Sequence, residues 1–296
     1  MQRQVEEFLR LLAVEKGYSK HTIAAYRNDL TQFLTYLAGE IVSSWQAVGR
    51  THILNYILYL KEREYASSTV ARKVASVKSF FHSLVADGVL QDDPTAAVDS
   101  PPVDKRLPRP LSPEKMVRLL AEPAKSDTPR ALRDCALLEL MYATGMRASE
   151  VIGLEMDVVD LEAGTVRCLG KGNKERLLPL YERAREALGA YLENGRARLL
   201  RGRETTVLFV NHRGRPLTRQ GLWLIVRTYA AAAGVEREVT PHTFRHSFAT
   251  HMLDGGAGLR ELQQLMGHAS IASTQVYTEI STRRKREAYD KAHPRA

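Results

Sequence analysis

Six polar side chains between residues 147 and 277 could together carry out chemistry on a phosphodiester. They are two arginines, a lysine, two histidines and a tyrosine, namely Arg147, Lys171, His242, Arg245, His268 and Tyr277. Guanidinium and ammonium groups bind phosphate oxygens, and imidazoles accept and donate protons near neutral pH. A tyrosine hydroxyl, with an ordinary pKa of about 10, becomes a nucleophile when a base takes its proton or cations stabilise the phenolate.

The local sequence predicts that His242 and Arg245 lie in the first turn of a helix. Thr240 is a good N-cap and Pro241 a good first residue, and positions three apart share a helix face. The free amides and positive dipole end of such a helix favour an anion. Taken alone, the motif more often means an exposed His and Arg pair.

Arg147 and Lys171 are expected at two further turns. Gly145 ends a helix, and Arg147 then begins another helical run in which Glu150 could orient its guanidinium. Lys171 lies between two glycines at the mobile tip of an expected β-hairpin. A surface ion pair and a solvent-exposed turn lysine are the alternative interpretations.

His268 and Tyr277 follow a helix end. Gly267 suits a left-handed conformation there, so the imidazole of His268 would project from the end of the helix. Tyr277 lies on a short segment that Ser270 could cap. A histidine that caps or packs and a tyrosine in a core are commoner than catalytic ones.

Two domains and a linker are expected to position these residues. Residues 1–99 show helical apolar spacing and predict a bundle of four helices, the third over 51–64 and the fourth from the N-cap Ser68 to about Ala86. Residues 100–110 hold four prolines and predict an extended basic linker. Residues 111–296 would form a second, catalytic domain.

The second domain is expected to be mainly helical with a small β-hairpin or sheet. Ser112 and Pro113 begin its first helix. Further helices are expected over about 132–143, 181–200 and 218–233, and strands over 165–169 and 176–180.

The charge distribution favours a polyanionic partner. The first 100 residues hold 11 basic and 11 acidic residues, so the whole net charge of +9 falls in residues 101–296. A basic domain suits nucleic acid, although a solvated basic surface is the plain alternative. Five further cations could give the first domain a basic face: Lys20, Arg27, Arg72, Lys73 and Lys78.

Cysteine usage and hydropathy favour a soluble, cytoplasmic protein. Cys135 and Cys168 form no CxxC motif or Cys/His cluster, which predicts reduced thiols and no metal site. No stretch approaches the roughly 20 apolar residues of a bilayer span. No membrane insertion is therefore expected.

Five segments around the six residues resemble signature segments of the tyrosine recombinase (phage integrase) family. They are residues 143–150, 170–176, 242–251, 265–268 and 275–278. The resemblance covers nearly the whole chain and is closest to the Xer recombinases of bacterial chromosomes, of the XerD type. It implies an N-terminal SAM-like helical bundle and a C-terminal α+β catalytic domain that clamp duplex DNA. Met266 stands where the family usually has leucine.

The resemblance also implies a role for each of the six residues. The two arginines would hold the scissile phosphate, and Tyr277 would attack it to form a 3′-phosphotyrosyl link. Lys171 would protonate the 5′-hydroxyl leaving group, His242 would take part in proton transfer, and His268 would hydrogen-bond a non-bridging oxygen. No cofactor is expected, because preorganised donors contribute on the order of 3 kcal/mol each and the tyrosyl link retains the phosphodiester energy.

The implied function is site-specific recombination that resolves chromosome dimers at a dif-like site of double-stranded DNA. The implied partners are a XerC-like recombinase, or further copies of this chain in a tetramer, and an FtsK-type translocase. The basic run 283–286 with Tyr289 would dock on a neighbouring protomer. The alternatives are an integrase of a phage or mobile element, a non-catalytic architectural DNA-binding protein and a type IB topoisomerase.

Overall fold

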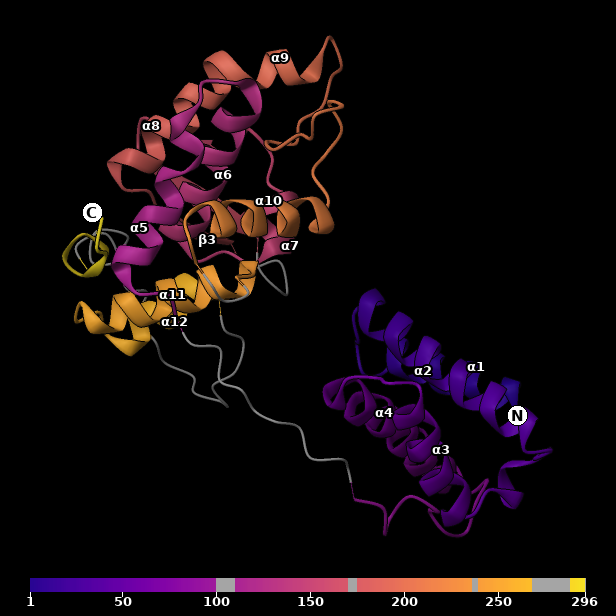
Figure 1. Ribbon diagram of the computed structural model, residues 1–296. Helices are drawn as coiled ribbons and strands as arrows, with labels where there is room; N and C mark the ends of the chain where they lie inside the picture. The colour runs from indigo at the N-terminus through magenta and orange to yellow at the C-terminus, as the bar shows by residue number, and fades with distance from the viewer. Residues whose placement is uncertain (100–109, 170–174, 236–238, 268–287, 296) are drawn as a thin grey trace. The chain divides into compact units, whose positions relative to one another are not determined.

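The computed structural model describes residues 1–99, 110–169, 175–235, 239–267 and 288–295 (Figure 1). The chain divides into two compact units, Met1–Arg106 and Leu107–Ala296. Residues 100–109 of the expected linker lie outside the described residues. Within the described ranges, no helix is long and apolar enough to cross a membrane.

The first unit is the expected bundle of four helices (Figure 1). They are α1 (Gln2–Val14), α2 (Lys20–Gly39), α3 (Arg50–Glu62) and α4 (Ser67–Ala86), with a 3-10 turn at Trp45–Ala47. Aromatic rings fill the core, where Phe33 meets Tyr56 edge-on with ring centroids 4.8 Å apart. The prediction of Ser68 as N-cap was wrong. Ala66 is the last extended residue (φ −54°, ψ 141°), so Ser68 already lies inside α4.

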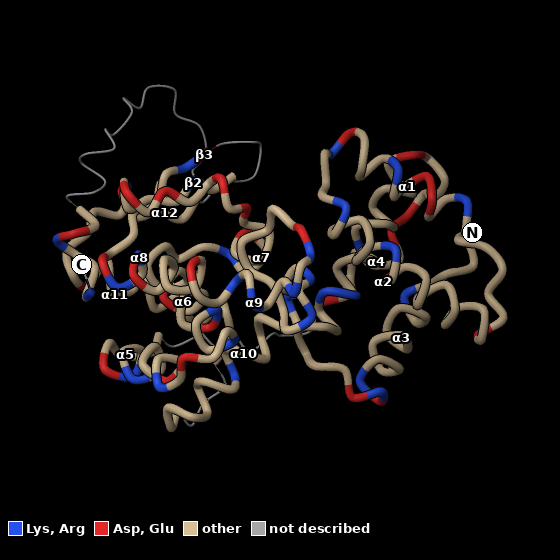
Figure 2. The backbone as a smooth tube through the Cα atoms, turned by 90° about the horizontal axis from the view of Figure 1, so that it is seen from above, with Lys and Arg blue, Asp and Glu red and all other residues tan. Residues whose placement is uncertain are grey.

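Three of the five cations expected on a basic face of this unit have structural roles, and one of them, Arg72, pairs with the buried carboxylate of Asp29. Lys73 is buried, and its Nζ lies 3.1 Å from the Oδ1 of Asp29. Lys78 Nζ donates to the Val98 carbonyl at 2.8 Å. Figure 2 shows Lys and Arg interspersed with Asp and Glu along these helices. The face is therefore less basic than the sequence predicted, because long-range pairing uses part of its charge.

The second unit is built around α6 (Pro129–Thr144), most of whose residues are buried. Helices α5 (Pro113–Ala121), α8 (Glu182–Ala190) and α11 (Pro241–Asp254) pack against it. The helix begins earlier than predicted, because the Thr128 hydroxyl caps it by accepting from the Ala131 N–H at 3.2 Å. Ser112 caps α5 as predicted, with its hydroxyl 3.4 Å from the Lys115 N–H.

The predicted hairpin is part of an antiparallel sheet in the order β1, β2, β3. Its strands are β1 (Val159–Asp160), β2 (Thr165–Leu169) and β3 (Glu175–Pro179), and Cys168 pairs with Arg176. Strand β3 lies one residue earlier than predicted, since Glu175 already pairs with Leu169. β1 was not predicted, because two residues carry no periodic signal.

The remaining helices agree with the predicted ranges. A π-helical segment, Tyr191–Arg196, joins α8 to α9 (Ala197–Leu200), so the predicted helix 181–200 continues throughout. The others are α7 (Ala148–Ile152), α10 (Arg219–Ala232) and α12 (Leu259–Met266). The secondary structure of this unit is thus mainly helical with one small sheet, as expected.

The described C-terminal residues pack on the core of the second unit. Residues 288–292 are helical, and Tyr289 is fully buried. The His293 ring lies 4.8 Å from the ring centroids of both Tyr181 and Tyr289. A Cβ on Gly255 would lie 2.2 Å from the Ala292 carbonyl oxygen, so this contact depends on glycine. The basic run 283–286 lies outside the described residues.

Candidate active site

Arg147 stands between two helices and is held by a carboxylate. α6 ends at Gly145 in a left-handed conformation (φ 58°), as the sequence predicted, and Arg147 is the N-cap of α7. The Oε2 of Glu150 accepts from the Arg147 backbone N–H at 2.7 Å, and its Oε1 accepts from Nη1 at 3.0 Å. The prediction that Glu150 orients this guanidinium is confirmed.

His242 and Arg245 lie in the first turn and a half of α11. Thr240 and Thr243 form a reciprocal capping box, with the Thr240 N–H 3.0 Å from the Thr243 hydroxyl, and Pro241 is the first helical residue. His242 is exposed, whereas Arg245 is only 8% exposed. The predicted helix start is confirmed, and it leaves the imidazole accessible to solvent.

A close approach between α11 and the end of α6 brings the two arginines together. A Cβ on Gly145 would lie 2.3 Å from the Phe248 ring, so only glycine allows this packing. The Gly145 carbonyl accepts from Nη1 of Arg245 at 2.6 Å. One glycine therefore ends α6, leads to Arg147 and anchors Arg245.

The end of α12 receives both guanidinium groups. Arg245 Nη2 donates to the Met266 carbonyl at 2.7 Å, and Arg147 Nη2 donates to the Gly267 carbonyl at 3.2 Å. Gly267 has the predicted left-handed conformation (φ 63°). Carbonyls at a helix C-terminus carry partial negative charge and suit cationic donors. The Arg147 side chain is still 37% exposed, so it can also reach a ligand.

A third arginine, Arg176, belongs to the same cluster and was missed at the sequence level. Its Nη2 donates to Glu150 Oε2 at 2.7 Å, and its side chain is 9% exposed. Strand alternation carried the signal, since Arg176 shares a face with the fully buried Leu178. An arginine on a buried strand face requires a carboxylate partner.

The cluster carries an excess of positive charge. Burial, reinforced by the neighbouring Arg147 charge, lowers the pKa of Arg245 to about 10. Burial opposes ionisation of Glu150, but hydrogen bonds from Arg176 and the Arg147 backbone outweigh it and lower the pKa of that carboxyl. Three guanidinium groups thus lie around one ionised carboxylate, which favours binding of an anion.

Three of the six residues, Lys171, His268 and Tyr277, lie outside the described residues. The structure brings Arg147 and Arg245 together and places His242 one turn before Arg245 on α11. The nearest described residues along the chain are the strand ends Leu169 and Glu175 for Lys171, and the helix end at Gly267 for His268. Across the described ranges, no three His, Cys, Asp or Glu side chains gather as a metal site.

The family comparisons agree with this geometry. The chain matches the phage integrase family over residues 109–284 and the N-terminal SAM-like domain of phage integrases over residues 5–88. It belongs to the phage integrase family, the tyrosine recombinases, and is a site-specific DNA recombinase. A non-catalytic architectural role is therefore set aside.

The most similar relatives include Xer recombinases of both types. Tyrosine recombinase XerC of Roseiflexus sp. (strain RS-1) is 51% identical, covering 95% of this chain and 90% of the relative. Tyrosine recombinase XerD of Halalkalibacterium halodurans is 44% identical, covering 99% of this chain and 98% of the relative. The expected resemblance to Xer recombinases is confirmed.

A solved structure shares the fold. The XerH site-specific recombinase, bound to a palindromic difH substrate in a post-cleavage complex, superposes with a TM-score of 0.70 at 22% identity. The match covers 91% of this chain and 78% of that chain. The mainly helical catalytic unit with a small sheet is thus a fold that a DNA-bound recombinase also has.

Proposed function

We propose that the chain resolves chromosome dimers by recombining two dif-like sites of double-stranded DNA in the cytoplasm. Residues 1–99 and 111–296 are assigned to DNA binding and to catalysis, joined by the linker 100–110. The observation that carries the proposal is the convergence of Arg147 and Arg245 on the end of α12. Support also comes from the XerH recombinase, which shares the fold and was solved bound to a difH substrate.

The proposed reaction exchanges one phosphodiester for another. The Tyr277 oxygen attacks the phosphorus, the P–O5′ bond breaks, and a 3′-phosphotyrosyl link forms. His242 accepts the phenol proton, Lys171 protonates the departing 5′-oxygen, and His268 donates to a non-bridging oxygen. The 5′-hydroxyl of a partner strand then attacks the same phosphorus, which releases Tyr277 and joins the two strands. The reaction needs no ATP, because one phosphoester bond forms for each one that breaks and the phosphodiester energy stays in the tyrosyl link.

Arg147 and Arg245 have different parts in this reaction. Arg245 is buried and fixed by two carbonyls, so it supplies a preorganised charge. Arg147 is more exposed, and its guanidinium donates one hydrogen bond to Glu150 and one to the Gly267 carbonyl. We assign both to the non-bridging oxygens of the scissile phosphate, where charge increases in the pentavalent transition state.

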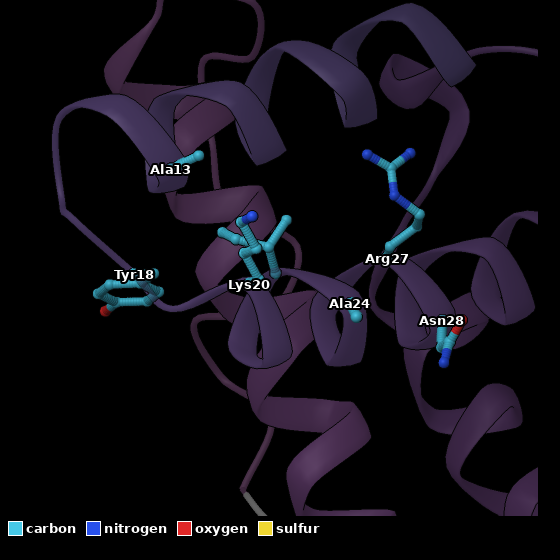
Figure 3. A pocket seen from close by; sticks show the side chains of 7 residues that line it. Ala13, Tyr18, Lys20, Ala24, Arg27 and Asn28 are labelled. Carbon is cyan, nitrogen blue, oxygen red and sulfur yellow. The ribbon is translucent and has the colours of Figure 1, made fainter. Parts of the chain in front are cut away.

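The first unit offers a complementary surface for the DNA backbone. An open hollow beside α1 and the start of α2 is lined by Ala13, Tyr18, Lys20, Ile23, Ala24, Arg27 and Asn28 (Figure 3). Arg27 pairs with Glu6, but its side chain remains 47% exposed. We assign this face of α2 to phosphate contacts, with small residues allowing close approach of the backbone.

The C-terminal segment suggests how protomers assemble. The buried Glu139 accepts from Tyr181 and Arg295, and Tyr289 and His293 fill the neighbouring apolar site. In the proposed tetramer, the same site on one protomer receives the C-terminal segment of the next. The partner is a XerC-like recombinase or a further copy of this chain, and the C-terminal region also meets an FtsK-type translocase.

A plasmid with two directly repeated dif-like sites tests the function. Purified chain, alone or mixed with a XerC-like protein from the same source, should excise the intervening segment without ATP or metal. Excision by the chain alone indicates a tetramer of one protein, whereas excision only in the mixture indicates two recombinases. Absence of excision under both conditions, with DNA bound, would contradict dimer resolution.

A further inference from the structure

Arg176 connects three parts of the proposed active site, although it is not one of the six proposed catalytic residues. It lies on β3 opposite Cys168, in the hairpin whose two strands flank residues 170–174. Its guanidinium reaches Glu150 on α7 and lies against Gly267 at the end of α12. A single buried side chain thus touches the segments that lead to Lys171, Arg147 and His268.

The contact with Glu150 determines how Arg147 is held. Arg176 Nη2 and the Arg147 backbone N–H both donate to Oε2 at 2.7 Å, which leaves Oε1 for the Arg147 guanidinium at 3.0 Å. A carboxylate bound at both oxygens has little rotational freedom. Removing Arg176 would free Glu150 to turn, and the guanidinium of Arg147 would lose its fixed orientation.

The contact with Gly267 supports the other donor of Arg147. A Cβ on Gly267 would lie 2.7 Å from Nη1 of Arg176 and 3.2 Å from its Cζ, so the guanidinium packs directly against this backbone. The same residue's carbonyl accepts from Arg147 Nη2. Arg176 therefore supports both anchors of Arg147, the carboxylate and the carbonyl.

Burying the charged side chain of Arg176 at this site is unfavourable for the free energy of folding. Its Nε and Nη1 are buried and have no hydrogen-bond partner among the described residues. Burying a guanidinium removes it from water and carries a desolvation penalty that an apolar side chain would avoid. An arginine in this position is explained by what it holds in place better than by stability.

We propose that Arg176 is a positioning residue for strand cleavage, which acts by fixing Glu150 and the Gly267 backbone around Arg147. The inference rests on the proposed function, because it assigns Arg176 to the phosphodiester chemistry of that site. It predicts a specific loss of cleavage rate with DNA binding retained.

The test compares Arg176→Met and Arg176→Lys with Arg167→Met. Arg167 is exposed on the neighbouring strand and lies outside the cluster, so it controls for charge removal in the same hairpin. The readouts are single-turnover formation of the covalent adduct on a nicked suicide duplex and affinity for the same duplex. Arg176→Met should slow cleavage by about 10- to 100-fold, the effect of a misplaced catalytic group, with affinity unchanged. Arg176→Lys should retain part of the rate, and Arg167→Met all of it.

A neutral phosphate separates positioning from general damage. When a methyl group replaces one non-bridging oxygen of the scissile phosphate, less negative charge remains for Arg147 to neutralise. The loss caused by Arg176→Met should then shrink to less than about threefold. An equal loss of cleavage rate on both duplexes, or a wild-type rate in Arg176→Met and Arg176→Lys, would overturn this inference and leave the proposed function standing. A wild-type chain that forms no adduct would overturn the proposed function as well.

Discussion

Arg147 and Arg245 donate to consecutive carbonyl groups at the end of α12, Gly267 and Met266, over 3.2 and 2.7 Å. The two residues come from α7 and α11, so three helices meet at one point. Backbone carbonyl groups of the protein itself hold both guanidinium groups. Charge fixed in this way needs no reorganisation when negative charge develops in a transition state.

The first prediction concerns Arg245→Lys. Lysine keeps the charge but lacks the planar fork of arginine, so its single nitrogen cannot occupy both positions from which Nη1 and Nη2 donate to Gly145 and Met266. Single-turnover cleavage should fall by about 100-fold or more, as on loss of one preorganised donor. Arg198→Lys, an exposed change on α9, is the matched control. Equal rates in the two variants would show that Arg245 serves only the fold.

The second prediction concerns Gly145→Ala. The substitution requires a left-handed alanine and a Cβ 2.3 Å from the Phe248 ring. It should lower the free energy of unfolding by about 3 kcal/mol, combining backbone strain with overpacking. Gly234→Ala has the same strain at φ 66° but open space around the Cβ, so about 1 kcal/mol is expected there. Urea denaturation of both variants measures the difference, and similar losses would rule out the Phe248 contact as the cause.

Features set by neighbouring residues were predictable from the sequence. The caps at Ser112 and Thr240 and the glycine ends at Gly145 and Gly267 depend on local backbone chemistry, and all four are present. They explain why the arginine positions could be expected at helix ends.

Features set by distant residues were not predictable. Arg176 joins the cluster through its hydrogen bond to Glu150, 26 residues earlier in the chain. Lys73 is buried because it pairs with Asp29, 44 residues earlier. The packing of Gly145 against Phe248 likewise follows from tertiary structure. No local pattern encodes such pairs, although strand alternation did mark Arg176 as facing inward.

The third prediction concerns acid. Burial, with help from Arg295, lowers the pKa of His293 from 6.5 to about 4, while its hydrogen bond to the Tyr142 carbonyl opposes the shift. The folded segment therefore favours neutral imidazole, and its stability is full above about pH 6.5 and lost as the pH falls toward 4. The loss amounts to about 3 kcal/mol by linkage.

His293→Gln keeps an N–H donor but cannot titrate, so it isolates this effect. Burial raises the pKa of the Glu139 carboxyl, so protonation of this group favours the folded state as the pH falls. This contribution opposes that of His293 and is the same in the wild type and in the variant. Hydrogen exchange of the residue 293 amide, which donates to the Tyr289 carbonyl at 2.8 Å, reports opening of the segment. After correction for intrinsic exchange, protection should decline with acid in the wild type and much less in the variant. Parallel curves would refute the assignment to His293.

The most direct test of the central claim is covalent capture of DNA by Tyr277. The full chain is incubated with a nicked suicide duplex carrying a dif-like site, and products are separated on a denaturing gel. The wild type should form a protein–DNA adduct whose digested peptide carries the nucleotide on Tyr277, and Tyr277→Phe should bind the duplex but form none. An adduct that persists in Tyr277→Phe, or a nucleotide on another residue, would contradict the account.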